Sequence, residues 1–173
     1  MEGYPWGGSE ELWYRVAKFS KENQNNVLVN IKHGDVRHHK IEELTILGAK
    51  IIERKSRGEN KLPVRIILKI RNKIFGPVKT NEWSWLKNES SNHIIISLGG
   101  PHDFLSHPEL FKILQNNKCN YSVIQQFNFE NIIYNEYDRR IVKLFYSKAI
   151  NSYFVSKRNL ETTERSICKK LEN

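Results

Sequence analysis

The sequence has 173 residues, two cysteines and a formal net charge of +9. This length suits one domain with its own hydrophobic core, so we expect a single domain over residues 1–173. The cysteines, Cys119 and Cys168, lie far apart without a neighbouring metal-ligand pattern, and this usage predicts neither a disulfide framework nor a zinc site.

No apolar run reaches the roughly 18 residues of a membrane span, and the N-terminus lacks the basic start and apolar stretch of a signal peptide. We therefore expect a cytoplasmic protein, with association with the inner face of the membrane left open. The positive charge raises nucleic acid as a partner, but the tightest basic group, Arg65, Lys69, Arg71 and Lys73, is typical of a solvated helix face. Nucleic acid is therefore not expected, whereas an anionic membrane surface or anionic substrate stays open.

The first half of the chain begins with acidic residues followed by apolar residues at helical spacing, which predict a helix over 9–23. Residues 26–31 are short, β-branched and apolar, as in a strand covered on both faces. A helix over 38–47 follows, and we expect it to stop at Gly48, because glycine tolerates the left-handed turn that ends many helices.

The later elements repeat this alternation of short apolar strands and helical patterns. They are a strand at 50–53, a loop at 54–62, a helix at 63–75, a strand at 93–98, a helix at 106–117, a strand at 120–125, a helix at 136–149, a strand at 152–155 and a helix at 157–171. Strands joined through helices form right-handed crossover units. We therefore predict an α/β protein with a Rossmann-like, doubly wound parallel sheet and helices on both faces.

Ligands of such sheets bind beyond the carboxyl ends of the strands, where helix N-termini point their N–H groups into the crevice. The first loop that fits is Trp6-Gly7-Gly8-Ser9-Glu10, whose paired glycines would let the backbone approach a phosphate or a sugar hydroxyl. An ordinary turn before a helix has the same composition, and no Walker lysine or full dinucleotide fingerprint accompanies it.

The second loop is Gly99-Gly100-Pro101-His102-Asp103, directly after the clearest buried strand. His102 and Asp103 would supply acid/base or hydrogen-bonding groups in the crevice. The alternative is a Gly-Pro turn in which Asp103 caps the next helix, and the sequence leaves both interpretations open.

The third loop is Gln125-Gln126-Phe127-Asn128-Phe129-Glu130, at the end of another strand. Its amide and carboxylate groups would bind sugar hydroxyls through directional hydrogen bonds. Residues of this kind also form ordinary turns, and both interpretations stay open.

The features above, taken in chain order, resemble a known family. They are the segments Trp6 to Trp13, Ile94 to Gly100, Gln126 to Glu130 and Tyr153 to Arg165. They resemble the N-terminal domain of family 4 glycosyltransferases, in which a Gly-Gly loop leads into the first helix and a late strand and helix carry an FVS..N...TE pattern. Residues 55–92 match only loosely.

The resemblance implies a GT-B enzyme, in which an N-terminal domain holds the acceptor and a C-terminal domain holds the nucleotide-sugar. Transfer takes place in the cleft between them, usually with retention and without a metal ion. The residues implied to bind substrate are Gly7, Gly8, Ser9 and Glu10 beside the donor phosphates, and Gly99, Gly100, His102, Asp103, Gln126, Asn128 and Glu130 around the acceptor. Many relatives have a histidine after the strand that matches 120–126, and this chain has none there, so no catalytic residue is assigned.

Two further departures shape the expected function. The family has a buried strand before the Gly-Gly loop, but only Met1 to Pro5 precede it here, so we expect a truncated first strand whose place another segment or chain fills. The family continues past the position of Asn173 into the donor-binding domain. We therefore expect no cofactor, no bound nucleotide-sugar and little or no transfer without a separate donor-binding chain.

The leading hypothesis is an acceptor-binding half of a glycosyltransferase for a sugar or glycolipid acceptor, such as a cell-envelope polysaccharide precursor. The alternative is a non-enzymatic binding module whose basic surface holds an anionic partner. A small nucleotide-binding enzyme of another class is disfavoured, because the sequence has no phosphate-loop signature.

Overall fold

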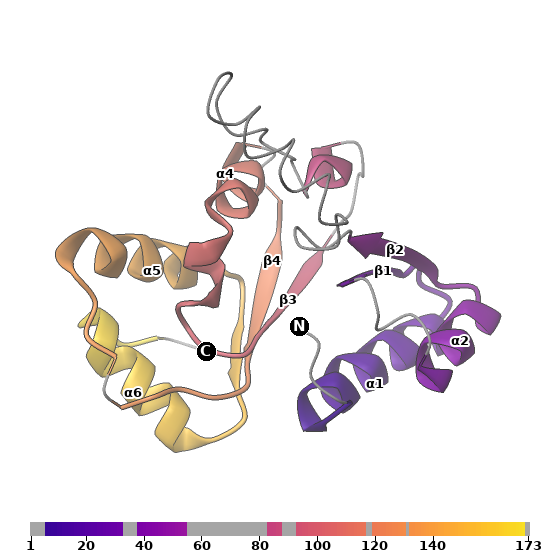
Figure 1. Ribbon diagram of the computed structural model, residues 1–173, viewed down its shortest axis with the longest axis horizontal. Helices are drawn as coiled ribbons and strands as arrows, with labels where there is room; N and C mark the ends of the chain where they lie inside the picture. The colour runs from indigo at the N-terminus through magenta and orange to yellow at the C-terminus, as the bar shows by residue number, and fades with distance from the viewer. Residues whose placement is uncertain are drawn as a thin grey trace, which may run out of the picture. The chain divides into compact units, whose positions relative to one another are not determined.

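The computed structural model describes residues 6–32, 38–54, 83–87, 93–116, 119–130 and 132–171. They fall into two compact units, an N-terminal unit within residues 1–82 and a C-terminal unit within residues 83–173, and each is described by itself. Each unit combines helices with a small parallel sheet, so the predicted α/β class is confirmed (Figure 1). The single domain and the doubly wound arrangement stay predictions.

The N-terminal unit is built from two helices and two parallel strands, close to their predicted positions. The elements are α1 (Gly8–Glu22), β1 (Leu28–Lys32), α2 (His39–Ile46) and β2 (Lys50–Arg54). The strands pair with Val29 opposite Ile51. A parallel pair needs a crossover connection, and helix α2 supplies it.

The core of the N-terminal unit lies between the helices and one face of the sheet. Val29 and Ile31 alternate along β1 and therefore point to the same face. They pack with Tyr14 of α1 and with Ile41 and Leu44 of α2. The amphipathic spacing that predicted both helices thus gives the residues that hold the unit together.

Gly48 ends the second helix as predicted. Its φ angle is +83°, in the left-handed region that residues with a Cβ adopt only at a cost in conformational energy. The backbone N–H groups of Gly48 and Ala49 bond back to Thr45 and Leu44, which satisfies two of the last carbonyl groups of the helix.

The C-terminal unit contains three parallel strands in the order β3-β4-β5. Its elements are η2 (Ser84–Lys87), β3 (Ile94–Leu98), η3 (Asp103–Ser106), α4 (Pro108–Asn116), β4 (Tyr121–Gln125), α5 (Glu136–Lys148), β5 (Ser152–Phe154) and α6 (Lys157–Ile167). The strand β4 lies in the middle and is buried along its whole length. The sequence predicted β3 as the clearest buried strand, because its residues are nearly all apolar, but Ile95 of β3 is 48% exposed. The more polar β4 is buried instead because it is the middle strand.

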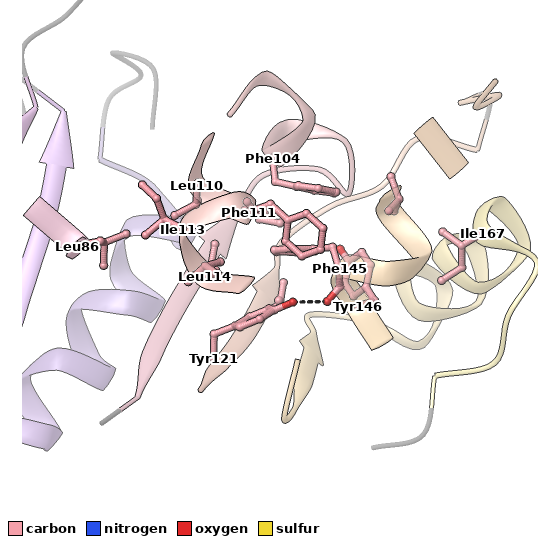
Figure 2. Packing of buried hydrophobic residues seen from close by; sticks show 14 of the residues in the cluster. Leu86, Phe104, Leu110, Phe111, Ile113, Leu114, Tyr121, Phe145, Tyr146 and Ile167 are labelled. Atoms are coloured by element: carbon pink, nitrogen blue, oxygen red, sulfur yellow. Dashed lines mark hydrogen bonds between the residues drawn. The ribbon is translucent and has the colours of Figure 1, made fainter. Parts of the chain in front are cut away.

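Aromatic side chains pack with one another inside the core of the C-terminal unit, among a larger number of aliphatic side chains (Figure 2). The ring of Phe145 stacks on that of Phe104 with centroids 4.1 Å apart and meets Phe111 edge to face at 5.7 Å. The hydroxyl of Tyr121 donates to the backbone oxygen of Phe145 at 2.6 Å, so its buried polar end is satisfied. These contacts join η3, α4 and α5 to one face of the sheet.

Two helix predictions differ from the structure at their ends. The helix predicted at 106–117 corresponds to α4, which begins at Pro108, a residue suited to the first helical turn, and follows the short 3-10 helix η3 (Asp103–Ser106). Residue 117 lies outside the described residues. The last helix ends at Ile167 rather than 171, because Cys168 takes a left-handed φ of +51°. The carboxylate of Glu164 then accepts the backbone N–H of Leu171 at 2.8 Å. The predicted helix at 63–75 and all but the first residue of the predicted loop at 54–62 lie outside the described residues.

Candidate functional site

The carboxyl ends of β3 and β4 bring the second and third predicted loops together. Leu98 and Gln125 are partners at the ends of these strands. Beyond them, the backbone N–H of Phe127 donates to the carbonyl of Gly99 at 2.8 Å, so the two loops remain joined outside the sheet. This edge of the C-terminal unit is the candidate site, as the topology of parallel sheets predicts.

The loop after β3 folds around its own acidic residue. The backbone N–H of Gly100 donates to Oδ2 of Asp103 at 2.8 Å, and Nε2 of His102 lies 3.6 Å from Oδ1 of the same carboxylate. A Cβ added to Gly99 would lie 2.8 Å from Asp103 Oδ2 and 3.1 Å from the ring of Phe127. Glycine is therefore required at position 99 by this close approach.

The loop after β4 turns its polar side chains toward the rest of the unit. Gln126 donates to the hydroxyl of Ser97 at 2.8 Å, and Asn128 donates to the hydroxyl of Thr163 at 3.0 Å. Glu130 receives Arg158 of α6 at 2.7 Å. All three predicted residues thus have partners within the chain, and the loop is held in one shape.

A buried polar network supports this loop from below. Gln125 is fully buried, and its amide nitrogen donates to Thr163 at 3.0 Å while its oxygen accepts the hydroxyl of Tyr146. Asn159 donates to the backbone oxygen of Gln126 at 3.0 Å. The network therefore fixes the end of β4 to helix α6 through satisfied hydrogen bonds.

Two buried tyrosines near this loop are themselves uncharged. Burial raises the pKa of Tyr146 well above its ordinary value, and electrostatic interactions with Tyr134 and Asp103 raise it further. Burial also raises the pKa of Tyr134, with smaller contributions from Asp103 and Asp138. Both phenols therefore stay protonated near neutral pH and do not act as bases. The hydroxyl of Tyr146 donates to Gln125, whereas the buried hydroxyl of Tyr134 has no hydrogen-bond partner among the described residues.

No protein-family model matches this chain, and neither the curated proteins nor the solved structures compared with it contain a match.

The first predicted loop lies in the N-terminal unit and repeats the geometry of the second. The backbone N–H of Gly7 donates to the carboxylate of Glu10 at 2.9 Å, three residues later, as Gly100 does to Asp103. Gly7 is the N-cap of α1 and Gly8 its first residue, while the side chain of Ser9 is outside the described part. The chain's own carboxylate thus occupies the positive end of the helix where a phosphate was expected.

A second cluster of polar and aromatic groups lies on the helices of the N-terminal unit. The imidazole of His38 stacks on Trp6 with centroids 3.8 Å apart. Lys40 pairs with Glu11 and lies 5.1 Å from the centre of the Tyr14 ring. These contacts connect α1 with the start of α2, so their evident role is to hold the two helices together.

Metal binding and membrane insertion find no support in the described residues. Within these ranges, no three His, Cys, Asp or Glu side chains are arranged to hold a metal ion. Nor does any helix there combine the length and the apolar character that crossing a bilayer requires.

The sequence did not indicate a role for two residues of α6 that support the third loop, or for the two phenylalanines of the loop itself. The network members Asn159 and Thr163 fall in the segment that carried the family pattern, and that pattern was the signal that could have identified them. Apolar side chains such as those of Phe127 and Phe129 are usually expected in the core, but in this loop both are exposed. Their exposed fractions are 44% and 57%.

Proposed function

We propose that this chain is the acceptor-binding half of a glycosyltransferase, which transfers a sugar from a nucleotide-sugar to a glycan or lipid-linked acceptor once a separate donor-binding chain completes the site. The finer architecture, a Rossmann-like doubly wound sheet of GT-B type, belongs to the same proposal. The likeness to family 4 glycosyltransferases in the sequence motivates it.

The observation that carries the proposal is the chemistry of the carboxyl edge of β3 and β4. Amides and hydroxyl groups gather there at the end of parallel strands, around Gln126, Asn128 and Thr163. The charged groups beside them do not form a positive site, because Arg158 pairs with Glu130 and Asp103 adds a carboxylate that accepts the backbone N–H of Gly100. Such a surface suits a neutral, hydroxyl-rich ligand better than a diphosphate.

The same chemistry supports the expected inactivity of the chain alone. Departure of a nucleoside diphosphate requires positive groups aimed at the developing charge. At the described edge, Arg158 is paired with Glu130, and Lys157 lies 3.7 Å from Glu161. The cations that would stabilise the leaving group are therefore assigned to the donor-binding chain.

Binding of small sugars to the purified chain tests the proposal. Saturation-transfer NMR would compare methyl glucoside, methyl galactoside and methyl mannoside with UDP-glucose and GDP-mannose. We expect saturation of at least one methyl glycoside that depends on sugar identity, no binding of either nucleotide-sugar, and loss of the signal in Asn128→Ala. The control Asn116→Ala changes an exposed amide at the end of α4 and should leave the signal intact.

Three results would overturn the proposal. Sugar transfer by the chain alone would contradict the expected inactivity. Binding of a nucleotide-sugar would contradict the acceptor-side assignment. Binding of polyanions that ignores sugar identity and collapses with added salt would favour the non-enzymatic module instead.

A further inference from the structure

Side chains of the loop after β4 alternate between two environments. Gln126, Asn128 and Glu130 bond to Ser97, Thr163 and Arg158, as described above. The intervening residues, Phe127 and Phe129, are 44% and 57% exposed. The polar residues therefore hold the loop in place, and the two aromatic rings are the side chains of the loop that are exposed without a polar partner.

The two rings are held in a defined arrangement. Their centroids lie 5.0 Å apart at an interplanar angle of 75°, an edge-to-face pair. The backbone of Phe127 is fixed by its hydrogen bond to Gly99, and its ring lies against the same glycine. An ordered aromatic pair loses little conformational entropy when a ligand stacks on it.

The charged groups described beside the pair leave no cation in excess, which narrows the choice of ligand. Glu130, the residue after Phe129, pairs with Arg158 at 2.7 Å. Asp103 adds a carboxylate, which accepts the backbone N–H of Gly100. A membrane contact would need cations in excess beside the aromatic groups, whereas an uncharged sugar needs only an aromatic face and hydrogen-bonding groups.

Asn128, which lies between the two phenylalanines in sequence, holds the loop rather than a ligand. Its amide nitrogen donates to Thr163 at 3.0 Å. Its Oδ1 has no hydrogen-bond partner among the described residues but is closed to solvent, so a sugar hydroxyl does not reach it in this conformation. The two exposed rings are therefore the surface of the loop that a sugar would contact.

We propose that Phe127 and Phe129 form a stacking platform for the apolar face of an uncharged pyranose ring in the acceptor. The C–H groups on one face of the ring pack on the aromatic surface. The inference rests on the proposed acceptor-binding function and names its substrate as a neutral sugar rather than an acidic or phosphorylated one.

The test uses the purified chain, the same three methyl glycosides and the variants Phe127→Ala, Phe129→Ala and Phe129→Trp. Stacking predicts upfield ring-current shifts of the C–H protons on one face of the bound sugar. We expect each alanine variant to weaken binding about tenfold, the equivalent of one strong aromatic contact, and the tryptophan variant to retain it. Ile133→Ala removes another exposed apolar side chain and should change nothing. Unchanged melting temperatures would show that the variants remain folded.

The outcomes separate this inference from the proposed function. If the chain binds a methyl glycoside and the alanine variants bind it equally well, the platform is wrong and the acceptor-binding function stands. If the chain binds no sugar, both fail. If the alanine variants lose sedimentation with phosphatidylglycerol vesicles but keep their affinity for sugar, the pair is a membrane contact and the platform is wrong.

Discussion

The hydroxyl of Thr163 accepts a hydrogen bond from the side-chain amide of Gln125 at 3.0 Å, and both residues are fully buried. It also accepts from Asn128 at 3.0 Å, so one hydroxyl of α6 connects the end of β4 with the loop that follows it. The shape of the candidate site therefore depends on this atom.

Replacement of this hydroxyl should destabilise the C-terminal unit. Thr163→Val keeps the volume but leaves two amide donors without their acceptor, so we expect the free energy of unfolding to fall by about 2 kcal/mol. Urea unfolding followed by circular dichroism measures the loss. The control is Thr162→Val, since that buried hydroxyl accepts only from the exposed Arg165 at 3.2 Å, and its loss should be much smaller. Equal losses in the two variants would contradict the role of Thr163.

Gly48 offers a test of backbone strain. Gly48→Ala places a Cβ on a residue with φ of +83°, where the nearest atom it would meet, Nζ of Lys21, is 3.8 Å away. The cost is therefore conformational rather than steric, and we expect the free energy of unfolding to fall by about 1 kcal/mol. Gly8→Ala is the matched control, because a Cβ there meets nothing within 4 Å at the start of α1. A loss of stability as large in Gly8→Ala would argue against strain at position 48.

His38 should make the N-terminal unit sensitive to acid. Burial lowers its pKa, and the positive charges of His39 and Lys40 lower it further. The unfolded chain then binds a proton more readily than the folded one, so stability is constant above the unfolded pKa and falls as the pH drops through about 6.5. Protonation at Nδ1 would also remove the acceptor for the backbone N–H of Lys40, which lies 3.3 Å away.

His38→Asn tests this mechanism, because asparagine caps a helix without titrating. Melting temperatures between pH 5 and 8 should decline less with falling pH than in the unsubstituted chain. His39→Asn alters the exposed neighbour and should preserve most of the decline. If His38→Asn and the unsubstituted chain lose stability in parallel, the acid sensitivity comes from another group.

Glu11 should titrate far below an ordinary glutamate. A hydrogen bond from Lys40, and a second from Arg15, lower its pKa to about 2. A lowered carboxylate pKa stabilises the fold above the unfolded value of 4.5, and this contribution is lost as the pH falls from there toward 2. In Lys40→Met, NMR titration of the side-chain carboxyl carbon should give a clearly higher pKa. Arg15→Met should shift it less, because the side chain of Arg15 is 74% exposed. An unchanged pKa in Lys40→Met would exclude this ion pair.

The strands and helices of the described residues were predictable because their signals are local. A nearly continuous apolar run predicted the strand β3, and a glycine predicted the end of α2. The early end of α6 was not predictable, because it depends on the carboxylate of Glu164 reaching the backbone of Leu171, a contact that helical periodicity does not report.

The candidate site was predictable in position but not in orientation. The order of strands placed Gly99 and Gln126 at one edge, and the structure joins their loops there. The sequence could not show that Gln126 and Asn128 bond inward while Phe127 remains exposed, because that choice depends on Ser97 and Thr163 lying below the loop. The orientation of these side chains therefore depends on hydrogen-bond partners that are distant in the sequence.

The two glycine loops close on acidic residues three positions away, Gly7 on Glu10 and Gly100 on Asp103. Both contacts are therefore formed within four consecutive residues, so in each loop the glycine and the acidic residue must be kept together for the contact to form.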